Sequence, residues 1–344
     1  MLRRYRNIVA LMFVGMMLML ASCDRMPLYE MEKKVELALD LKLELDLDID
    51  VTVDVDVEVK TQIEIPEMMQ VGFYSPDGTV LQNTQFVGAN GGKITTPPGV
   101  YRMVVYSFGN EYTQVRGEGS VNTLEAFTSD ITATKGPALL KALSMLSATT
   151  RADGDAETRD EGEQPTGPII YSPDHLLVTI QEVTIPEFTQ ESQTITIEST
   201  VQTICKTYSF EVHSVIGTEY VESCEAFVTN QARSSFFGRG EINPEPATIW
   251  FPVGVDRKKG CLYTTFNSFG KLPGDSRAFI HFIIRDVKGN EHYFSTDITD
   301  QFLRTDNHIV IEETVDVPEP EYASGGIAPT VEEWKEENND VNIG

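Results

Sequence analysis

The sequence predicts an all-β chain whose strands form sandwiches or barrels. Through much of the chain apolar residues alternate with polar ones, the pattern of strands with one buried face. Turn residues (Gly, Pro, Asn and Asp) interrupt this alternation about every 8–12 residues, a spacing typical of sandwiches and barrels rather than of βαβ units. The one candidate for a helix is the short segment 136–147, with Pro137 at a first helical position and apolar residues along one side.

The first 23 residues have the three parts of an export signal in the expected order. Arg3, Arg4 and Arg6 precede an apolar run over 8–20, which is shorter than the ~20 residues that a transmembrane helix needs. The ending Leu20-Ala21-Ser22-Cys23 resembles the bacterial lipobox. We therefore expect residues 1–22 to be a lipoprotein signal peptide and Cys23 to carry a membrane-anchoring lipid. The alternative is an uncleaved membrane helix, or a simple signal peptide with a chance cysteine.

Composition narrows the class of protein and its partners. The chain has 53 acidic and 27 basic residues and a net charge of −26, whereas nucleic-acid binding needs clusters of Lys and Arg. The sequence therefore argues against a nucleic-acid partner. Hydrophobic residues make up 41%, enough for real cores, and the length after the signal suggests two domains.

The alternating segment 35–59 is the most unusual feature. Every odd position is Val, Leu or Ile, and the even positions are mostly acidic. Fully extended, it would span about 80 Å, far more than an ordinary strand. It is therefore a long strand that bends between sheets, two strands with a hidden bulge, or a segment ordered only with a partner. Its Asp-rich face could be a calcium ladder, but flat strands do not gather ligands around one ion, so a charged, solvated edge is favoured.

The remaining strands divide into two groups separated by a polar stretch. Residues 148–167 are rich in Asp, Glu, Gly and Thr and are predicted to be a flexible acidic linker between an N-terminal domain, 23–147, and a C-terminal domain, 168–317. Residues 318–344 form a Pro/Gly-rich acidic tail. The expected strands are 69–74, 80–87, 93–96, 100–108, 176–183, 193–205, 206–213, 220–228, 247–252, 262–269, 279–286, 291–298 and 308–314.

No catalytic, cofactor or metal motif is present in the sequence. It lacks GxSxG, HExxH, a Walker loop and a dinucleotide glycine fingerprint. The five histidines lie far apart on different expected strands, without cysteine or carboxylate at ligand spacing; they are His175, His213, His281, His292 and His308. We expect no catalytic residue, no cofactor and no metal.

Three cysteines follow Cys23, namely Cys205, Cys224 and Cys261. An odd number outside the cytoplasm allows one bridge at most. Cys205 and Cys224 flank an expected hairpin near Gly217, which could bring them within the ~7 Å that a disulfide needs between Cα atoms. Three reduced, buried cysteines are an equal alternative.

Two stretches resemble Bacteroides lipoproteins of the fimbrillin-like family of unknown function. In the first half these are Val71-Gly-Phe-Tyr-Ser-Pro-Asp-Gly78, Thr96-Pro-Pro-Gly-Val-Tyr-Arg102 and Val104-Val-Tyr-Ser-Phe108, and in the second half Thr264-Thr-Phe-Asn-Ser-Phe-Gly270. The resemblance covers most of the chain after residue 60, but neither 35–59 nor 148–167. It implies two tandem β-sandwich domains of transthyretin-like or Ig-like type on a bacterial cell surface.

The resemblance also implies a function. Members of the wider group form or anchor fimbriae by donating a strand to a neighbour's sheet. The first hypothesis is a non-catalytic fimbrial subunit, fimbrial anchor or adhesin, lipid-anchored in the outer membrane, whose partners are other fimbrial subunits or ligands on host or bacterial surfaces. The second is a surface glycan-binding lipoprotein, which needs an exposed aromatic platform; Trp250 and Trp334 are the only tryptophans, and Trp250 lies in an apolar strand. A secreted hydrolase is least favoured.

Overall fold

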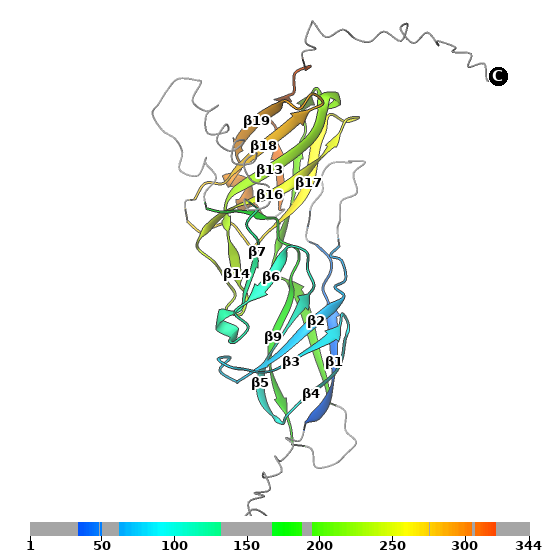
Figure 1. Cartoon of the computed structure of the whole chain (residues 1–344), viewed down its shortest axis with the longest axis vertical. Helices are drawn as coiled ribbons and strands as arrows, with labels where there is room; N and C mark the ends of the chain where they lie inside the picture. The colour runs from blue at the N-terminus through cyan, green and yellow to red at the C-terminus, as the bar shows by residue number, and fades with distance from the viewer. Residues whose placement is uncertain are drawn as a thin grey trace, which may run out of the picture.

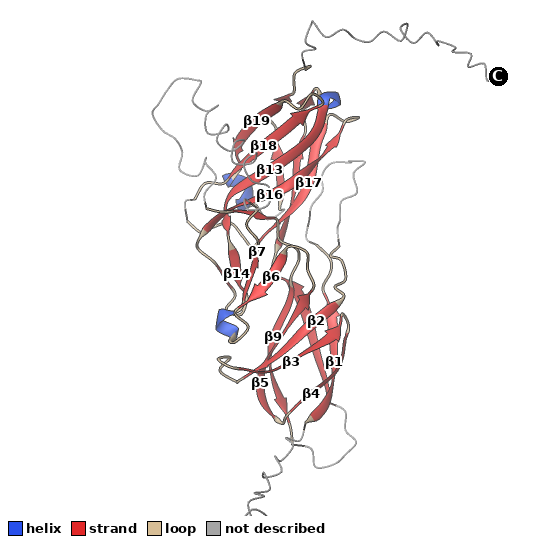
Figure 2. Ribbon diagram, viewed as in Figure 1, coloured by secondary structure: helices blue, strands red, loops and turns tan. Residues whose placement is uncertain are grey.

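The molecule is elongated, with its sheets arranged one after another along the long axis (Figure 1). The computed structural model describes residues 34–47, 49, 62–131, 167–187, 195–274, 276–304 and 307–320. A closed seven-stranded barrel occupies one end, an eight-stranded sheet the other, and a four-stranded sheet lies between them (Figure 2). A two-stranded sheet completes the set. Within the described ranges, no helix is long and apolar enough to cross a membrane.

The barrel follows the order β1-β10-β9-β5-β2-β3-β4 and is flattened into two layers. Two seams between neighbouring strands are short: β9 and β10 share two residue pairs, and β3 and β4 share one. One layer is therefore β9-β5-β2-β3 and the other is β10-β1-β4. The strands are β1 (Val35–Leu43), β2 (Met68–Tyr74), β3 (Leu81–Gly88), β4 (Gly91–Thr96), β5 (Gly99–Phe108), β9 (Leu177–Ile185) and β10 (Ile195–Thr203).

Strand β1 is the middle strand of the three-stranded layer. It pairs in parallel with β10 from Leu37 to Leu43 and antiparallel with β4 from Val35 to Asp40. Its odd positions point inward, as the alternation in the sequence requires: Val35, Leu37, Leu39 and Leu41 are buried in the barrel core. Burying four such side chains contributes about 6–12 kcal/mol of apolar transfer free energy as an upper estimate.

The eight-stranded sheet folds over to enclose its own core. Phe210 of β11 contacts Phe282 of β18 with ring centroids 5.1 Å apart, although three other strands separate β11 from β18 in the sheet order. The sheet therefore forms a sandwich rather than an open layer. Its order is β19-β18-β13-β16-β17-β11-β20, with β8 pairing in parallel with β16. The strands are β8 (Ile169–Tyr171), β11 (Lys206–Val212), β13 (Val221–Ala232), β16 (Pro246–Asp256), β17 (Cys261–Ser268), β18 (Phe279–Asp286), β19 (Glu291–Asp297) and β20 (His308–Ile311).

The four-stranded sheet joins strands from both halves of the chain. Its order is β15-β14-β7-β6, and β7 pairs with β14 at Phe127–Ser234 and Ala126–Ser235. The strands are β6 (Thr113–Arg116), β7 (Glu125–Thr128), β14 (Ser234–Phe236) and β15 (Glu241–Ile242); the two-stranded sheet is β12 (Val215–Ile216) with β21 (Val315–Asp316). The described helical turns are 3₁₀: η1 (Val121–Thr123), η2 (Thr218–Tyr220) and η3 (Thr299–Leu303).

The all-β prediction is confirmed, and the strands expected from alternation are present within a few residues, although β13 and β16 are longer and β20 is shorter. The expected helix at 136–147 lies outside the described residues, and the helical elements that are described are 3₁₀ turns only. The division of the chain differs from the expected tandem order. Strands β9 and β10 were assigned to the domain 168–317, yet they complete the barrel with β1 to β5.

The described residues cover only part of the alternating segment. Its first third is β1, after which residues 46 and 62 form an antiparallel bridge, and the amide of Ile63 donates to the carbonyl of Leu45 at 2.7 Å. Residues 45 and 46, just past β1, therefore pair with residues 62 and 63, and the three alternatives for the whole of 35–59 stay predictions. Residues 48 and 50–61 lie outside the described ranges.

A core role for β1 predicts a large effect from truncating Leu37, whose side chain is fully buried. We expect Leu37→Ala to lower the free energy of unfolding by about 2–5 kcal/mol, because it leaves a cavity between the two layers. The measurement is urea unfolding followed by circular dichroism. Lys42→Ala, on the exposed side of the same strand, is the matched control and should change stability by less than about 0.5 kcal/mol. Equal effects of the two substitutions would contradict the core assignment.

Candidate functional site

The position of β1 makes it a candidate site for strand exchange. Its two neighbours, β4 and β10, do not pair with each other, so β1 alone bridges them. Without β1, both would expose unpaired backbone N–H and C=O groups along the sides of an apolar slot. The slot walls include Ile94 of β4 and Val201 of β10, both fully buried in the same core. The slot is thus shaped for one extended segment with alternating apolar residues.

The fit of β1 in this slot is close at one glycine. Gly91 has φ +96°, and a Cβ built there would lie 2.0 Å from the carbonyl oxygen of Leu39. Only glycine permits β1 and β4 to approach at that point. On the outer side, Lys93 pairs with Glu36 at 2.8 Å, but both side chains are mostly exposed, so this ion pair adds little stability. The slot is therefore held by apolar burial and backbone pairing.

Side-chain amides close the barrel next to the slot. At the β3–β4 seam Gln85 donates to the carbonyl of Thr95 at 2.7 Å and accepts from its amide at 2.9 Å, while Asn83 donates to the same carbonyl at 2.9 Å. These side chains replace backbone pairs that the diverging strands cannot make. The β3–β4 seam therefore resists entry of a foreign strand, whereas the facing edges of β4 and β10 are paired through β1 itself.

A third apolar cluster joins the barrel to the rest of the molecule. It combines Tyr74 and Tyr106 from the outer face of the barrel with Leu124, Phe237 and Phe269 from beyond it. The rings of Tyr106 and Phe237 contact edge to face with centroids 5.8 Å apart. The Tyr74 hydroxyl donates to the carbonyl of Glu118 at 2.9 Å, and burial raises its pKa to about 12, with the Glu118 charge adding to the effect. The junction is therefore packed like a core.

Of the two alternatives for the cysteines, a Cys205–Cys224 disulfide or three reduced thiols, the structure has the second. Cys205, Cys224 and Cys261 are all free and buried. Cys205 lies in the apolar cluster that joins the barrel to the rest of the molecule, and Cys224 lies in the sandwich core. Cys205 directly precedes β11 and Cys224 lies in β13, and these two strands pair with other strands rather than with each other. The hairpin that would have joined them does not form. The lipidation site Cys23 lies outside the described residues.

Two of the five histidines converge in a way that the sequence did not indicate. His213 Nε2 lies 2.9 Å and His308 Nε2 3.8 Å from Oε2 of the buried Glu211, and Ser209 Oγ lies 2.6 Å from His308 Nδ1. Parallel pairing of β20 with β11 brings them together from about 100 residues apart. Although Ser, His and Glu are the residue types of a hydrolase triad, Ser209 is fully buried, so its hydroxyl cannot reach a substrate. Among the described residues, no His, Cys, Asp and Glu group could hold a metal.

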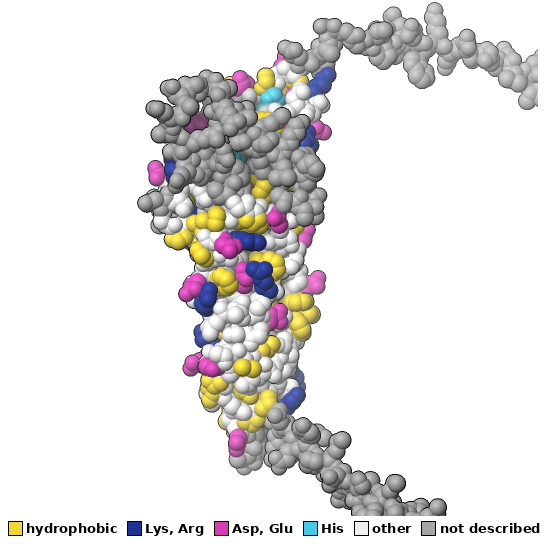
Figure 3. All heavy atoms as spheres, turned by 60° about the vertical axis from the view of Figure 1, so that its left-hand side comes forward, with side chains coloured by type: hydrophobic (Ala, Val, Ile, Leu, Met, Phe, Trp, Pro, Cys, Tyr) yellow, Lys and Arg dark blue, Asp and Glu magenta, His cyan; other side chains and the backbone are white. Residues whose placement is uncertain are grey.

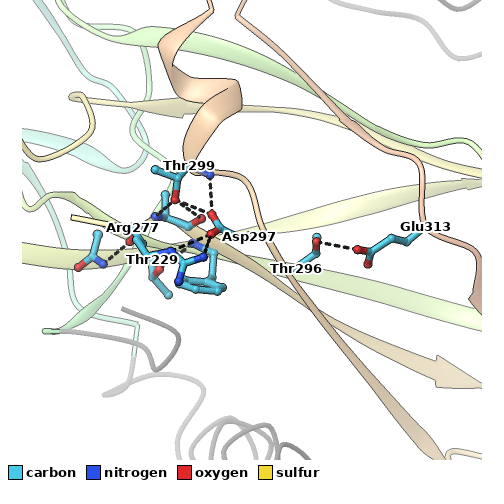
Figure 4. Close-up of polar contacts among 9 residues, drawn as sticks. Thr229, Arg277, Thr296, Asp297, Thr299 and Glu313 are labelled. Atoms are coloured by element: carbon cyan, nitrogen blue, oxygen red, sulfur yellow. Dashed lines mark hydrogen bonds and ion pairs between the residues drawn. The ribbon is translucent and has the colours of Figure 1, made fainter. Parts of the chain in front are cut away.

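A polar network at one end of the sandwich is satisfied internally. Asp297 accepts hydrogen bonds from the amide of Thr299 at 2.8 Å and from Arg277, and Thr299 Oγ1 accepts from the amide of Ala278 at 2.9 Å (Figure 4). Burial raises the pKa of Asp297, but the bonds from Thr299 and Arg277 outweigh it and leave the pKa below its usual value. The network ties the start of β18 to the end of β19 and has a structural role.

Charged residues on the visible face of the four-stranded sheet are paired rather than grouped by sign (Figure 3). Arg116 binds Glu125 through Nε at 2.7 Å and lies over the Phe127 ring at 4.6 Å, and Arg233 binds Glu245 at 2.8 Å. Basic and acidic side chains alternate there with hydrophobic ones. This face therefore carries no strong field of one sign.

Comparison with known proteins identifies the family. The domain of unknown function DUF5119 matches residues 41–252, more than half of the chain. The chain belongs to the DUF5119 family. The resemblance to fimbrillin-like lipoproteins is confirmed. The DUF5119 match begins inside β1 and runs across 148–167, two stretches that the resemblance did not cover.

Two relatives of this DUF5119 chain come from Bacteroides ovatus. A protein named as a fimbrium anchoring subunit, Fim4B, is 25% identical over 263 residues, which are 74% of this chain and 67% of the relative. A crystal structure of a protein named as an adhesin matches with a TM-score of 0.53 and 19% identity, covering 83% of this chain and 93% of the other. The structural likeness shows that the two proteins share a fold.

The buried thiols lead to a prediction about redox chemistry. Burial raises the pKa of the Cys205 thiol to about 12 and also raises the pKa of Cys224. Because the thiolate is the reactive form, we expect a soluble alkylating reagent at pH 7.5 to leave Cys205 and Cys224 unmodified in the folded protein and to modify them in urea. Mass spectrometry of peptides measures this. A Cys205–Cys224 disulfide peptide from protein purified without reductant would contradict the free-thiol assignment.

Proposed function

We propose that this chain is a non-catalytic fimbrial anchoring subunit or adhesin of the cell surface, held in the outer membrane by a lipid on Cys23. The observation that carries the proposal is β1, which begins 12 residues after Cys23 and is, among the described strands, the one that pairs with both β4 and β10. Membership of the family, the name of the relative Fim4B and the fold shared with an adhesin support it.

The path of the chain favours an anchoring geometry. Twelve residues span at most about 43 Å, so a lipid on Cys23 keeps the start of β1 near the membrane. β1 begins at the end of the barrel remote from the eight-stranded sheet (Figure 1). The barrel would then face the membrane and the sandwich would project outward. A pull on the sandwich would load β1 along its length, against backbone pairs to both neighbours at once.

Strand exchange at the β1 slot is the proposed mode of assembly. A segment of another fimbrial subunit would occupy the slot, or β1 would occupy that of a neighbour, with backbone pairing giving affinity and alternate apolar residues giving specificity. The proposal includes the fold class: two β-sandwich units of transthyretin-like or Ig-like type. The flattened barrel is one of these units. Ligands on host or bacterial surfaces are the alternative partners for an adhesin.

Lipid attachment is tested by replacing Cys23. We expect Cys23→Ser to abolish incorporation of an alkyne-labelled fatty acid and to move the protein from the membrane to the soluble fraction. The reason is that the lipid is the proposed anchor, and no helix among the described residues is long and apolar enough to cross a membrane. Cys261→Ser is the matched control and should leave both measurements unchanged. If Cys23→Ser remained labelled and membrane-bound, the lipid proposal would be wrong.

Strand exchange is tested by locking β1 in place. Ala38 and Lys93 are register partners on β1 and β4, and such neighbours have Cα separations that a disulfide can bridge. In the full chain carrying Ala38→Cys and Lys93→Cys, we expect oxidation to block co-assembly with fimbrial subunits and reductant to restore it. Native gels and electron microscopy report assembly. Ala38→Cys alone is the control, and equal assembly of the locked and reduced forms would exclude exchange at this slot.

A further inference from the structure

A cleft of about 550 Å³ lies where the barrel meets the sandwich. Its walls come from the residues before β2, from the loop after β5, from the residues that lead into β9, and from β11 and β17. The volume lies within the ~300–1,000 Å³ of small-ligand sites. Leu47, four residues past the end of β1, also lines the cleft, but no residue of β1 itself does.

The floor of the cleft holds a hydrogen-bonded chain of His175, Thr207 and Asn267. His175 Nε2 lies 3.1 Å from Thr207 Oγ1, which donates to Asn267 Oδ1 at 2.8 Å, while His175 Nδ1 lies 2.9 Å from Thr203 Oγ1. Since Thr207 donates onward, His175 donates to it from Nε2, and in the neutral form this leaves Nδ1 to accept from Thr203. Burial lowers the pKa of His175 to about 4, although Asp174 opposes the shift. The imidazole therefore stays neutral at physiological pH.

The rim combines carboxylates and amides without a basic residue. The exposed carboxylates of Glu67 and Glu111 and the amides of Gln62 and Asn110 line the cleft, and its described lining residues include no Lys or Arg. Carboxylates make strong hydrogen bonds to hydroxyl groups and repel anions. The lining therefore suits a neutral ligand rich in hydroxyls and excludes phosphorylated, sulfated or uronic-acid ligands.

An aromatic platform borders this polar rim. Phe108 lines the cleft, and its ring contacts that of Phe86 edge to face with centroids 5.1 Å apart. Phe108 is 47% exposed and Phe86 50%, large values for such side chains, and Met68, the register partner of Phe108, is 40% exposed beside them. The negative face of an aromatic ring attracts the C–H groups of a sugar ring, while its hydroxyls point to polar partners.

From these observations we infer that the junction cleft binds a neutral oligosaccharide, with Phe108 and Phe86 as the stacking platform and Glu67, Glu111 and Asn110 as partners of the hydroxyl groups. This role extends beyond fimbrial anchoring and rests on none of its steps. It also provides an aromatic platform that Trp250 does not, while Trp334 lies outside the described residues. Trp250 lies in β16 and packs against Tyr171, with ring centroids 5.7 Å apart.

The test is affinity electrophoresis of the full chain, released from membranes in detergent, in gels containing neutral polysaccharides (galactan, mannan, xylan, α-glucan and β-glucan) or acidic ones. We expect retardation by at least one neutral polysaccharide and by none of the acidic ones, with little effect of salt. Phe108→Ala should weaken the retardation about three- to tenfold, the share of one aromatic contact. Val100→Ala, at the other end of the same strand and 48% exposed, is the matched control and should have no effect.

Three outcomes would overturn the proposal. They are absence of retardation across the neutral panel, binding to acidic polysaccharides alone, and neutral binding that Phe108→Ala leaves unchanged. Urea unfolding of Phe108→Ala separates lost binding from lost folding, and Glu111→Gln gives a second, polar probe of the same cleft. If Phe108→Ala instead impairs co-assembly with fimbrial subunits and no saccharide binds, the surface is a protein interface.

Discussion

The architecture depends on the insertion of β1 between β4 and β10. This strand supplies the whole middle of one barrel layer, and its buried side chains are worth about as much as the 5–15 kcal/mol by which a domain is typically stable. Because β10 barely pairs with β9, β1 is also what keeps β10 in the barrel. Since β10 leads directly into β11 of the sandwich, the position of β1 bears on the junction as well.

At two strand edges a side-chain amide pairs with both backbone groups of one residue. At the β3–β4 seam, Gln85 uses its amide to satisfy both backbone groups of Thr95. At β20, Gln301 does the same for Val310, donating at 2.9 Å and accepting at 2.7 Å. A side-chain amide occupies a backbone pair without offering a further edge, so it closes a sheet to foreign strands. The β1 slot has no such cap, which is why exchange is physically reasonable there.

The sequence predicted the strands far better than their arrangement. The alternation of Leu37, Leu39 and Leu41 gave the correct inward face of β1, and the expected strands 279–286 and 291–298 correspond to β18 and β19. The four-stranded sheet was missed entirely, because β6, β7, β14 and β15 have two to four residues each, too few for a period to be recognised. The tandem division failed for a different reason. Which sheet a strand joins depends on non-local pairing, such as β5 with β9, and no local pattern encodes that.

The difference between local patterns and non-local pairing also explains which parts of the candidate sites the sequence could predict. Period 2 identified 35–59 as unusual, and β1 is the strand that the described residues of this segment form. The junction cleft, in contrast, draws Glu67, Asn110, His175 and Asn267 from four separate stretches, each of which is unremarkable in an acidic chain. A search for tryptophan could not find its platform either, since Phe86 and Phe108 become neighbours only when β3 and β5 flank β2. A slot for one strand is filled by one sequence segment, so the pattern of that segment predicts it. A cleft between sheets forms only when separate stretches of the chain fold together, so no single stretch predicts it.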